Sequence, residues 1–354
     1  MELPFFKKTD VVALDIGSNA VKTVQLAPTK KGWKLVKIGM SQLPPEAIVD
    51  GSIIDSMTVI NVVRDLIGQQ DIRVKNTVSA LTGHSVIIKK VNLPVMTEAE
   101  LSESIQWEAE QYIPFPITDV NIDFQILGAD TEGRGQMEVM LVAVKKDVIN
   151  DYTNVIKEAG LAPVIVDVDS FALENMFEIN YSIVPNENVA IVNIGATITS
   201  INILRSGITI FTRAIPLGGN QFTEEIQKTM SISFRDAETI KLGGTVNGID
   251  AGNIPEVIER VSGNVALEVK RSIDFFLGGA PGMFISKIYL SGGCAKTKGL
   301  QAIIQDKTAI PVEITNPFIN IECSPKKFAP DYIKEVAPYF GVSVGLAIRK
   351  VGDK

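Results

Sequence analysis

The feature that most constrains how this chain can fold is an internal repeat. The stretch VVALDIGSNAVKTVQL, which ends at Leu26, aligns with VAIVNIGATITSINIL, which ends at Leu204. Each copy contains a β-forming run, a polar residue, a glycine with small neighbours and a second β-forming run, the pattern of a hairpin with a small-residue turn. Asp15 aligns with Asn193, and the offset of 193 − 15 = 178 residues is half of the 354-residue chain. The repeat therefore predicts two related α/β domains made by duplication of a whole domain, rather than a short solenoid unit.

Length and composition agree with two domains and exclude several classes of protein. With 45% hydrophobic residues the chain can bury two proper cores. A net charge of −7 offers no broad basic surface, so we expect no nucleic-acid partner. Cys294 and Cys323 are too few for a disulfide framework and form no C-x-x-C zinc spacing. The opening MELPFFKKTD lacks the apolar core of a secretory leader, and no apolar run is long enough to span a bilayer, so we expect a cytoplasmic protein.

The first half carries a segment with no counterpart in the second half. Residues 86–91 read as a strand, Thr97 and Glu100 form a capping box that opens a helix, and residues 120–126 alternate as a half-buried strand does. A further helix is expected over residues 147–159. The expected units are a first half at 1–86 and 164–187, an inserted α+β subdomain at 87–163, and a second half at 188–354 with a helical subdomain at about 221–284.

The helix that begins at Glu98 is unusually acidic. It carries five glutamates and no Lys or Arg before Ile113. Such a run is usually a solvated face, and on a protein that meets the tail of a membrane protein it is a candidate docking surface for basic residues. Trp107 and Tyr112, on the same helix, are expected to lie in the core, with interface anchors as the alternative interpretation.

The first glycine hairpin, DIGSNAVK, has the parts of a phosphate clamp. Gly17 lets the backbone approach an anion, Ser18 and Asn19 offer hydroxyl and amide donors, and Lys22 supplies a point charge. Asp15 is the candidate magnesium ligand, normally through water, because magnesium dehydrates reluctantly. The alternative interpretation is a tight β-turn with a surface lysine.

The second hairpin, NIGATITS, is interpreted as the opposing jaw of the clamp. Here Asn193 is followed by Gly195, Ala196 and Thr197, which offer backbone amides and a hydroxyl. Two related turns that face each other across a cleft can bind phosphates from both sides. If each hairpin were only an ordinary β-turn, the presence of a matching second hairpin would have no explanation.

Two later motifs are candidates for the rest of a nucleotide. In SGGCAKTKGL, Gly292 and Gly293 follow an apolar strand and let the backbone pass flat against a planar ring such as adenine, and Lys296 in the same turn is a further candidate ligand. An ordinary strand-to-helix turn is the alternative. In AETIK, Glu238 and Lys241 lie three residues apart on one helical face, suited to ribose hydroxyls or to a simple surface ion pair.

The order of these motifs resembles the phosphate, phosphate, ribose and adenosine segments of the superfamily that joins actin, sugar kinases and heat-shock ATPases. VDVDSFALENMF and APYFGVSVGLAIRK resemble the two connecting helices of that superfamily. The resemblance implies an actin-like fold, a duplicated ribonuclease H-like architecture, and binding of ATP with Mg²⁺.

The insertion resembles the 1C subdomain that the FtsA and PilM families share, and the phrases LPVMTEAEL and QWEAEQYIPFP resemble the PilM family. FtsA proteins normally end in an amphipathic membrane helix, whereas this sequence stops at Lys354. Resemblance to PilM implies a peripheral inner-membrane scaffold of type IV pilus assembly that binds the short cytoplasmic N-terminal tail of PilN. It also implies contacts with motor ATPases and the platform protein, membrane attachment only through partners, and self-association, for example in a ring.

Asn193 departs from the superfamily pattern, because the second phosphate hairpin commonly begins with an acid that organises magnesium and the attacking water. The resemblance therefore implies ATP binding with little turnover and no assigned catalytic residue. Two other functions remain open: an FtsA-like filament-forming ATPase, and a small-molecule kinase. Asp167 and Asp169 are the only candidates for the general base that such a kinase would need.

Overall fold

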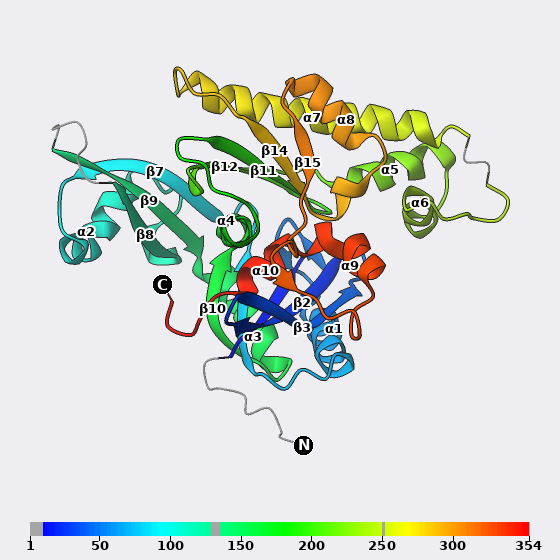
Figure 1. Cartoon of the computed structure of the whole chain (residues 1–354), viewed down its shortest axis with the longest axis horizontal. Coiled ribbons are helices and arrows are strands. Elements are labelled where there is room, and N and C mark those ends of the chain that lie inside the picture. The colour runs from blue at the N-terminus through cyan, green and yellow to red at the C-terminus, as the bar shows by residue number, and fades with distance from the viewer. Residues whose placement is uncertain (1–9, 129–134, 250–251, 354) are drawn as a thin grey trace.

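The computed structural model describes residues 10–128, 135–249 and 252–353. The opening segment discussed above lies outside them, apart from Asp10. The chain forms two α/β halves, with the insertion projecting from one side (Figure 1). Within the described residues, no helix is long and apolar enough to cross a membrane.

The first half is built on a six-stranded sheet in the order β10-β6-β1-β2-β3-β16. Strands β1 and β2 form the first glycine hairpin, in which Asp15 stands directly opposite Lys22. Strands β6 and β10 add to the other side of β1 in parallel. The strands are β1 (Val12–Ile16), β2 (Ala20–Thr29), β3 (Gly32–Gln42), β6 (Asn76–Leu81), β10 (Ala162–Val168) and β16 (Ile321–Glu322).

The second half repeats this topology. Its sheet has the order β13-β12-β11-β14-β15, with β11 antiparallel to β12 and parallel to β14. Strand β11 thus occupies the place of β1, and β12, β13, β14 and β15 those of β2, β3, β6 and β10. The strands are β11 (Asn188–Ile194), β12 (Thr199–Arg205), β13 (Ile208–Ile215), β14 (Lys287–Ser291) and β15 (Val312–Ile314). The predicted pair of α/β halves is confirmed.

Two helices, α4 (Asp169–Asn180) and α10 (Gly341–Ala347), lie between the two sheets (Figure 1). Their buried side chains share one core with residues from both sheets, such as Val24 and Ile191. The two helices cross with their backbones in contact, because a Cβ atom added to Gly345 would lie only 1.6 Å from the carbonyl oxygen of Ala172. The connecting helices expected from the sequence therefore join the halves through a shared core.

Successive side chains of a strand point to opposite faces of its sheet, so each sheet has a second face of apolar side chains to bury. Other helices cover these outer faces. Val12 and Leu14 pack under α1 (Ser56–Gln69) and α3 (Lys146–Glu158). The outer face of the second sheet packs on α5 (Gly219–Met230), α7 (Ile254–Gly278) and α8 (Leu300–Thr308). The remaining short elements are β4 (Ile48–Val49), β5 (Ser52–Ile53), η1 (Ile117–Asp119), α6 (Phe234–Lys241), η2 (Gly293–Lys296), α9 (Pro330–Val336) and η3 (Ala337–Phe340).

The insertion is a three-stranded antiparallel sheet in the order β7-β9-β8, covered by helix α2. The elements are β7 (Val86–Pro94), α2 (Glu98–Glu110), β8 (Val120–Gly128) and β9 (Gln136–Lys145). The capping box is present, since the Thr97 hydroxyl accepts from the Glu100 amide while the Glu100 carboxylate accepts from the Thr97 amide. Leu101, Ile105 and Ala109 pack on the sheet.

Two features of this region differ from the sequence-based expectations. Helix α3 lies within the range 87–163, but its buried residues, including Tyr152 and Ile156, belong to the core of the first half. The insertion as a packed unit is therefore narrower than that range and ends with β9. Trp107 was expected in the core, and this is wrong: its side chain is 79% exposed, whereas Tyr112 is half-buried against the insertion sheet.

Candidate nucleotide-binding site

The two glycine turns are closed in the same way. The Gly17 amide donates to the carbonyl of Ala20 at 3.1 Å, and the Gly195 amide donates to the carbonyl of Ile198 at 2.9 Å. These two amides are therefore engaged within their own turns, and a contact of Gly195 with a phosphate stays a prediction.

The amides at the tips of the turns are differently placed. Within the part of the chain that the structure describes, the backbone N–H groups of Ser18, Asn19, Ala196 and Thr197 donate no hydrogen bond. Consecutive backbone amides at a turn form a concave anion-binding site. Each hairpin thus offers two adjacent donors, as a phosphate clamp requires.

The two turns meet across the junction of the halves. The hydroxyls of Ser18 and Thr197 lie 2.9 Å apart, although the residues are 179 positions apart in sequence. Related turns, one from each half, therefore face each other with their donor-bearing tips in contact.

The charged residues of the first hairpin form an ion pair beside this contact. The Lys22 Nζ atom lies 2.9 Å from Oδ2 of Asp15, and the two side chains are only 16% and 15% exposed. A Cβ atom on Gly17 would stand 3.7 Å from the Lys22 ammonium and 3.9 Å from Oδ1 of Asp15. The glycine therefore leaves open the space beside both charges, so a phosphate oxygen and a hydrated cation can approach them.

Asp15 suits magnesium held largely by phosphates and water. Among the described residues, no group of three or more Asp, Glu, His or Cys side chains could form an all-protein metal cage. Magnesium is usually bound by one or two carboxylates together with substrate phosphates and waters. A single carboxylate beside the clamp is consistent with that chemistry.

The start of helix α5 is a part of the site that the sequence-based prediction did not assign. The amides of Gly219 and Asn220 donate to the carbonyls of Gly195 and Ala196 at 2.8 and 2.7 Å. A Cβ atom on Gly218 would lie 2.6 Å from the Ala196 carbonyl oxygen. The helix N-terminus, with its partial positive charge, is thereby docked against the second phosphate turn. The signal in the sequence was the pair Gly218 and Gly219 directly before a helical stretch.

Glu238 and Lys241 form the expected ion pair, with 2.6 Å between their charged atoms, but the pair is not a solvated surface contact. The Lys241 ammonium also donates to the Thr223 hydroxyl at 2.9 Å and to the Gly219 carbonyl at 3.2 Å. The two side chains are 20% and 12% exposed. They fix α6 to the N-terminal turn of α5, beside the clamp, and their contact with a ribose stays a prediction.

The glycines of the SGG turn allow close packing on both sides. Gly292 has φ 88°, and a Cβ atom there would lie 2.4 Å from the Ile194 carbonyl oxygen. A Cβ atom on Gly293 would lie 2.8 Å from Cε1 of Tyr339, so a planar ring does pack on this backbone, but it is a tyrosine of the same chain. Lys296 pairs with Glu335 and lies 5.8 Å from the centre of the Tyr339 ring. Adenine binding at this turn stays a prediction.

Asn193 lies where β11 approaches the SGG turn. Its Oδ1 atom is 2.8 Å from the position that a Cβ atom on Gly292 would take. The side chain is half-buried. At the second phosphate turn this chain therefore has an amide where the superfamily commonly has a carboxylate.

Asp167 and Asp169 are both engaged in the interior. Asp169 accepts from the Thr82 hydroxyl of the first half and from the Ser200 hydroxyl of the second, each at 2.9 Å. Burial raises the pKa of Asp169, although those two hydrogen bonds oppose the shift. Burial also raises the pKa of Asp167, whose Oδ2 lies 3.5 Å from a guanidinium nitrogen of Arg349. Neither carboxylate is presented as a free general base.

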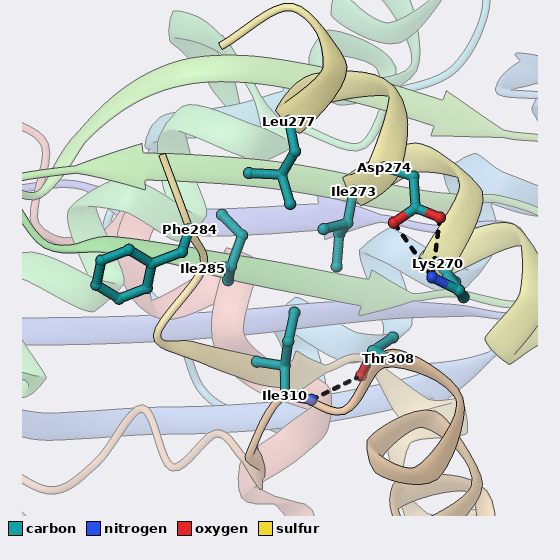
Figure 2. A pocket seen from close by; sticks show the side chains of 8 residues that line it. All are labelled: Lys270, Ile273, Asp274, Leu277, Phe284, Ile285, Thr308 and Ile310. Atoms are coloured by element: carbon teal, nitrogen blue, oxygen red, sulfur yellow. Dashed lines mark hydrogen bonds and ion pairs between the residues drawn. The ribbon is translucent and has the colours of Figure 1, made fainter. Parts of the chain in front are cut away.

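Two surface hollows lie away from the clamp. One, of about 170 Å³, is lined by apolar side chains of α7 and its neighbours, with the Lys270–Asp274 ion pair on its rim (Figure 2). None of the predicted nucleotide ligands lines it. A second, of about 370 Å³, lies where the insertion meets α3 and is lined by residues that include Phe115, Pro116 and Lys145.

Comparison with known families decides between the two related groups. The family model described as "Type IV pilus assembly protein PilM" matches residues 13–351. The chain belongs to the PilM family. In the solved "PilM-PilN type IV pilus biogenesis complex", a chain with 29% identity superposes with a TM-score of 0.87, covering 97% of this chain and 99% of that one.

More distant relatives agree on the fold of this PilM-family protein. The cell division protein FtsA of Bacillus subtilis (strain 168) is 24% identical over 358 aligned positions, which cover 86% of this chain and 78% of FtsA. MreB5 of Spiroplasma citri bound to AMPPNP has 16% identity and a TM-score of 0.52, covering 93% of this chain and 98% of MreB5. The actin-like fold expected from the sequence is thereby confirmed.

Proposed function

We propose that this PilM-family protein is a cytoplasmic ATP-binding scaffold of the type IV pilus assembly machine. It binds the short N-terminal cytoplasmic tail of the membrane protein PilN, is held at the inner membrane through that partner, and links PilN to the assembly motor. Mg²⁺ accompanies the nucleotide, with Asp15 and phosphate oxygens as its ligands.

The proposal that the protein binds ATP rests on the contact between the hydroxyls of Ser18 and Thr197, which lie on two matched turns. ATP binding exchanges this hydroxyl contact for contacts from both turns to the phosphates. Because the turns belong to different halves, a bound triphosphate holds the halves together. ATP therefore acts on the relative position of the halves, which is what a scaffold with little turnover needs.

The partner site is best sought where the insertion meets the first half. Strands β8 and β10 are each at the edge of their sheets, and an edge strand can pair with an extended peptide. Asp123 on β8 lies close enough to Asp167 on β10 to affect its pKa. The hollow beside Phe115 and Pro116 opens at the same junction and offers a pocket for an apolar side chain of the tail.

The contacts of the Asp167 and Asp169 carboxylates favour a scaffold over a kinase. A kinase needs a carboxylate free to accept a proton from a substrate hydroxyl. In this chain one carboxylate is occupied by two hydroxyl donors and the other lies against Arg349. We therefore expect no phosphoryl transfer to sugars.

The experiment that tests the proposal removes the insertion without disturbing the first half. Lys89 and Leu141 are direct partners in the antiparallel pair of β7 and β9, so an Asn-Gly turn can replace residues 90–140. We expect the shortened protein to fold and to bind ATP, because the phosphate turns lie outside the insertion, and to lose capture of a synthetic PilN tail peptide. Phe115→Ala in the full chain should also weaken capture, with Phe284→Ala, an exposed residue of the second half, as its control. Undiminished capture by the shortened protein would exclude the insertion as the docking module.

A further inference from the structure

The negative charge of the chain is concentrated in the insertion. Residues 86–145, from the start of β7 to the end of β9, contain ten Asp or Glu and four Lys or Arg, a net charge of 4 − 10 = −6, while the whole chain carries −7. The rest of the chain therefore carries −7 − (−6) = −1. An acidic subdomain on a nearly neutral body attracts cationic partners to one place on the surface.

Helix α2 presents part of this charge on a single outward face. Residues spaced three and four apart lie together on one side of a helix. Glu103, Trp107 and Glu110 have that spacing, opposite the side on which Leu101 and Ile105 are buried against the insertion sheet. All three are exposed. In the described part of the chain, neither Glu103 nor Glu110 makes an ion pair or a side-chain hydrogen bond.

Trp107 distinguishes this face from an ordinary solvated one. Its side chain is 79% exposed, and it lies between the two glutamates on α2, the helix at the outer edge of the insertion (Figure 1). A solvated acidic face gains nothing from an indole, whereas Trp is enriched among the residues that dominate binding energy at interfaces. Its ring is also the best side-chain platform for a cation. An aromatic centre with a charged rim is the anatomy of a docking surface.

We propose that the face of α2 defined by Glu103, Trp107 and Glu110 docks a basic segment of a partner protein. Lys or Arg side chains of that segment pair with the two carboxylates, and one of them lies over the Trp107 ring. The rim charge decides the chemistry of the occupant, because these carboxylates repel anionic lipid headgroups and nucleic acids. None of these three residues lines the hollow proposed for the PilN tail, and so this face is a second docking site that goes beyond the proposed function.

A synthetic peptide of arginine and leucine tests the proposal, with a peptide of the same length containing glutamate in place of arginine as the non-binding probe. The chain has two tryptophans, so Trp33→Phe leaves Trp107 as the single tryptophan, whose fluorescence can be followed in the titration. We expect the basic peptide to change Trp107 fluorescence. We expect Trp107→Ala to weaken its binding about tenfold or more, as loss of an interface anchor does.

Matched variants separate a docking face from general attraction to an acidic protein. Glu103→Gln with Glu110→Gln should weaken binding and reduce its salt dependence, because two charge contacts are removed. Asp306→Asn with Glu259→Gln removes the same charge from exposed positions of the second half and should leave binding unchanged. Equal losses in the two double variants, or peptide binding without a change in Trp107 fluorescence, would overturn the proposal. Concentration-dependent association of the protein alone that Trp107→Ala abolishes would overturn it too, because the occupant would then be a second copy of the chain.

Discussion

The ion pair between Lys22 and Asp15 gives the most direct test of the phosphate clamp. Lys22→Met keeps most of the apolar stem and removes the charge. A hydrogen bond from a charged donor contributes about 1.5–3 kcal/mol. Because about 1.4 kcal/mol corresponds to a tenfold change in affinity, loss of the ammonium should raise the Kd for Mg-ATP by roughly ten- to a hundredfold.

The same substitution also affects the free protein, and the structure shows how to separate the two effects. Without Lys22, the Asp15 carboxylate is left only 15% exposed and without its partner at 2.9 Å, which should cost about 1–3 kcal/mol of unfolding free energy. Asp15→Asn combined with Lys22→Met removes both charges, so stability should largely return. ATP binding should not return, since the phosphate contact is still missing.

Isothermal titration with Mg-ATP and urea unfolding of the three proteins would measure these quantities. Lys34→Met is the matched control, because Lys34 makes an ion pair with Glu322 at 2.8 Å on the exposed edge of the first sheet, away from the clamp. If Lys22→Met bound ATP as tightly as Lys34→Met and the wild type, Lys22 would have no place in the site. If the double variant recovered ATP affinity along with stability, the loss in the single variant would reflect the unpaired carboxylate instead.

The other predictions concern hydrolysis and pH. Asn193→Asp should speed single-turnover ATP hydrolysis with only a modest change in affinity, because a carboxylate is a better ligand for hydrated magnesium and a better acceptor for the attacking water, and a water-positioning contact strengthens in the transition state; an unchanged rate would contradict this. Burial raises the pKa of Asp169 above its ordinary 3.8, so the folded state holds the proton more tightly than the unfolded state. The wild type should then lose stability relative to Asp169→Asn as the pH rises from 3.8 through the folded-state pKa. Parallel pH profiles of urea unfolding for the two proteins would exclude such a shift.

The hairpins and the duplicated topology could be predicted from sequence because their signals are local. A glycine turn is closed between residues three apart, as in Gly17 and Ala20, and the repeated pattern reveals its twin. The contact between Ser18 and Thr197 could only be inferred from the duplication, since it depends on how the two halves pack. No sequence motif predicts the two hydroxyls that donate to Asp169, because Thr82 and Ser200 come from different halves and meet Asp169 only in the folded chain.

The two differences between expectation and structure in the insertion have different origins. The helix α3 was predicted, but its amphipathic pattern does not say which core the apolar face joins, and Tyr152 packs on the first half. The error over Trp107 was avoidable. Trp107 follows Ile105 by two residues, which is about 200° around a helix, so the period that buries Ile105 turns Trp107 outward.

The crossing of α4 and α10 constrains how the two halves can move relative to each other. Gly345 has no side chain to separate the two helices, so its backbone packs directly against the Ala172 carbonyl of the other helix. Sliding one helix along the other would force backbone atoms over that oxygen, whereas tilting about it would not. We therefore expect any opening or closing of the two halves to be a rotation about this contact. In a rotation the displacement grows with distance from the axis, so small changes at the phosphate turns should give larger displacements at the insertion, which lies at the outer edge of the first half.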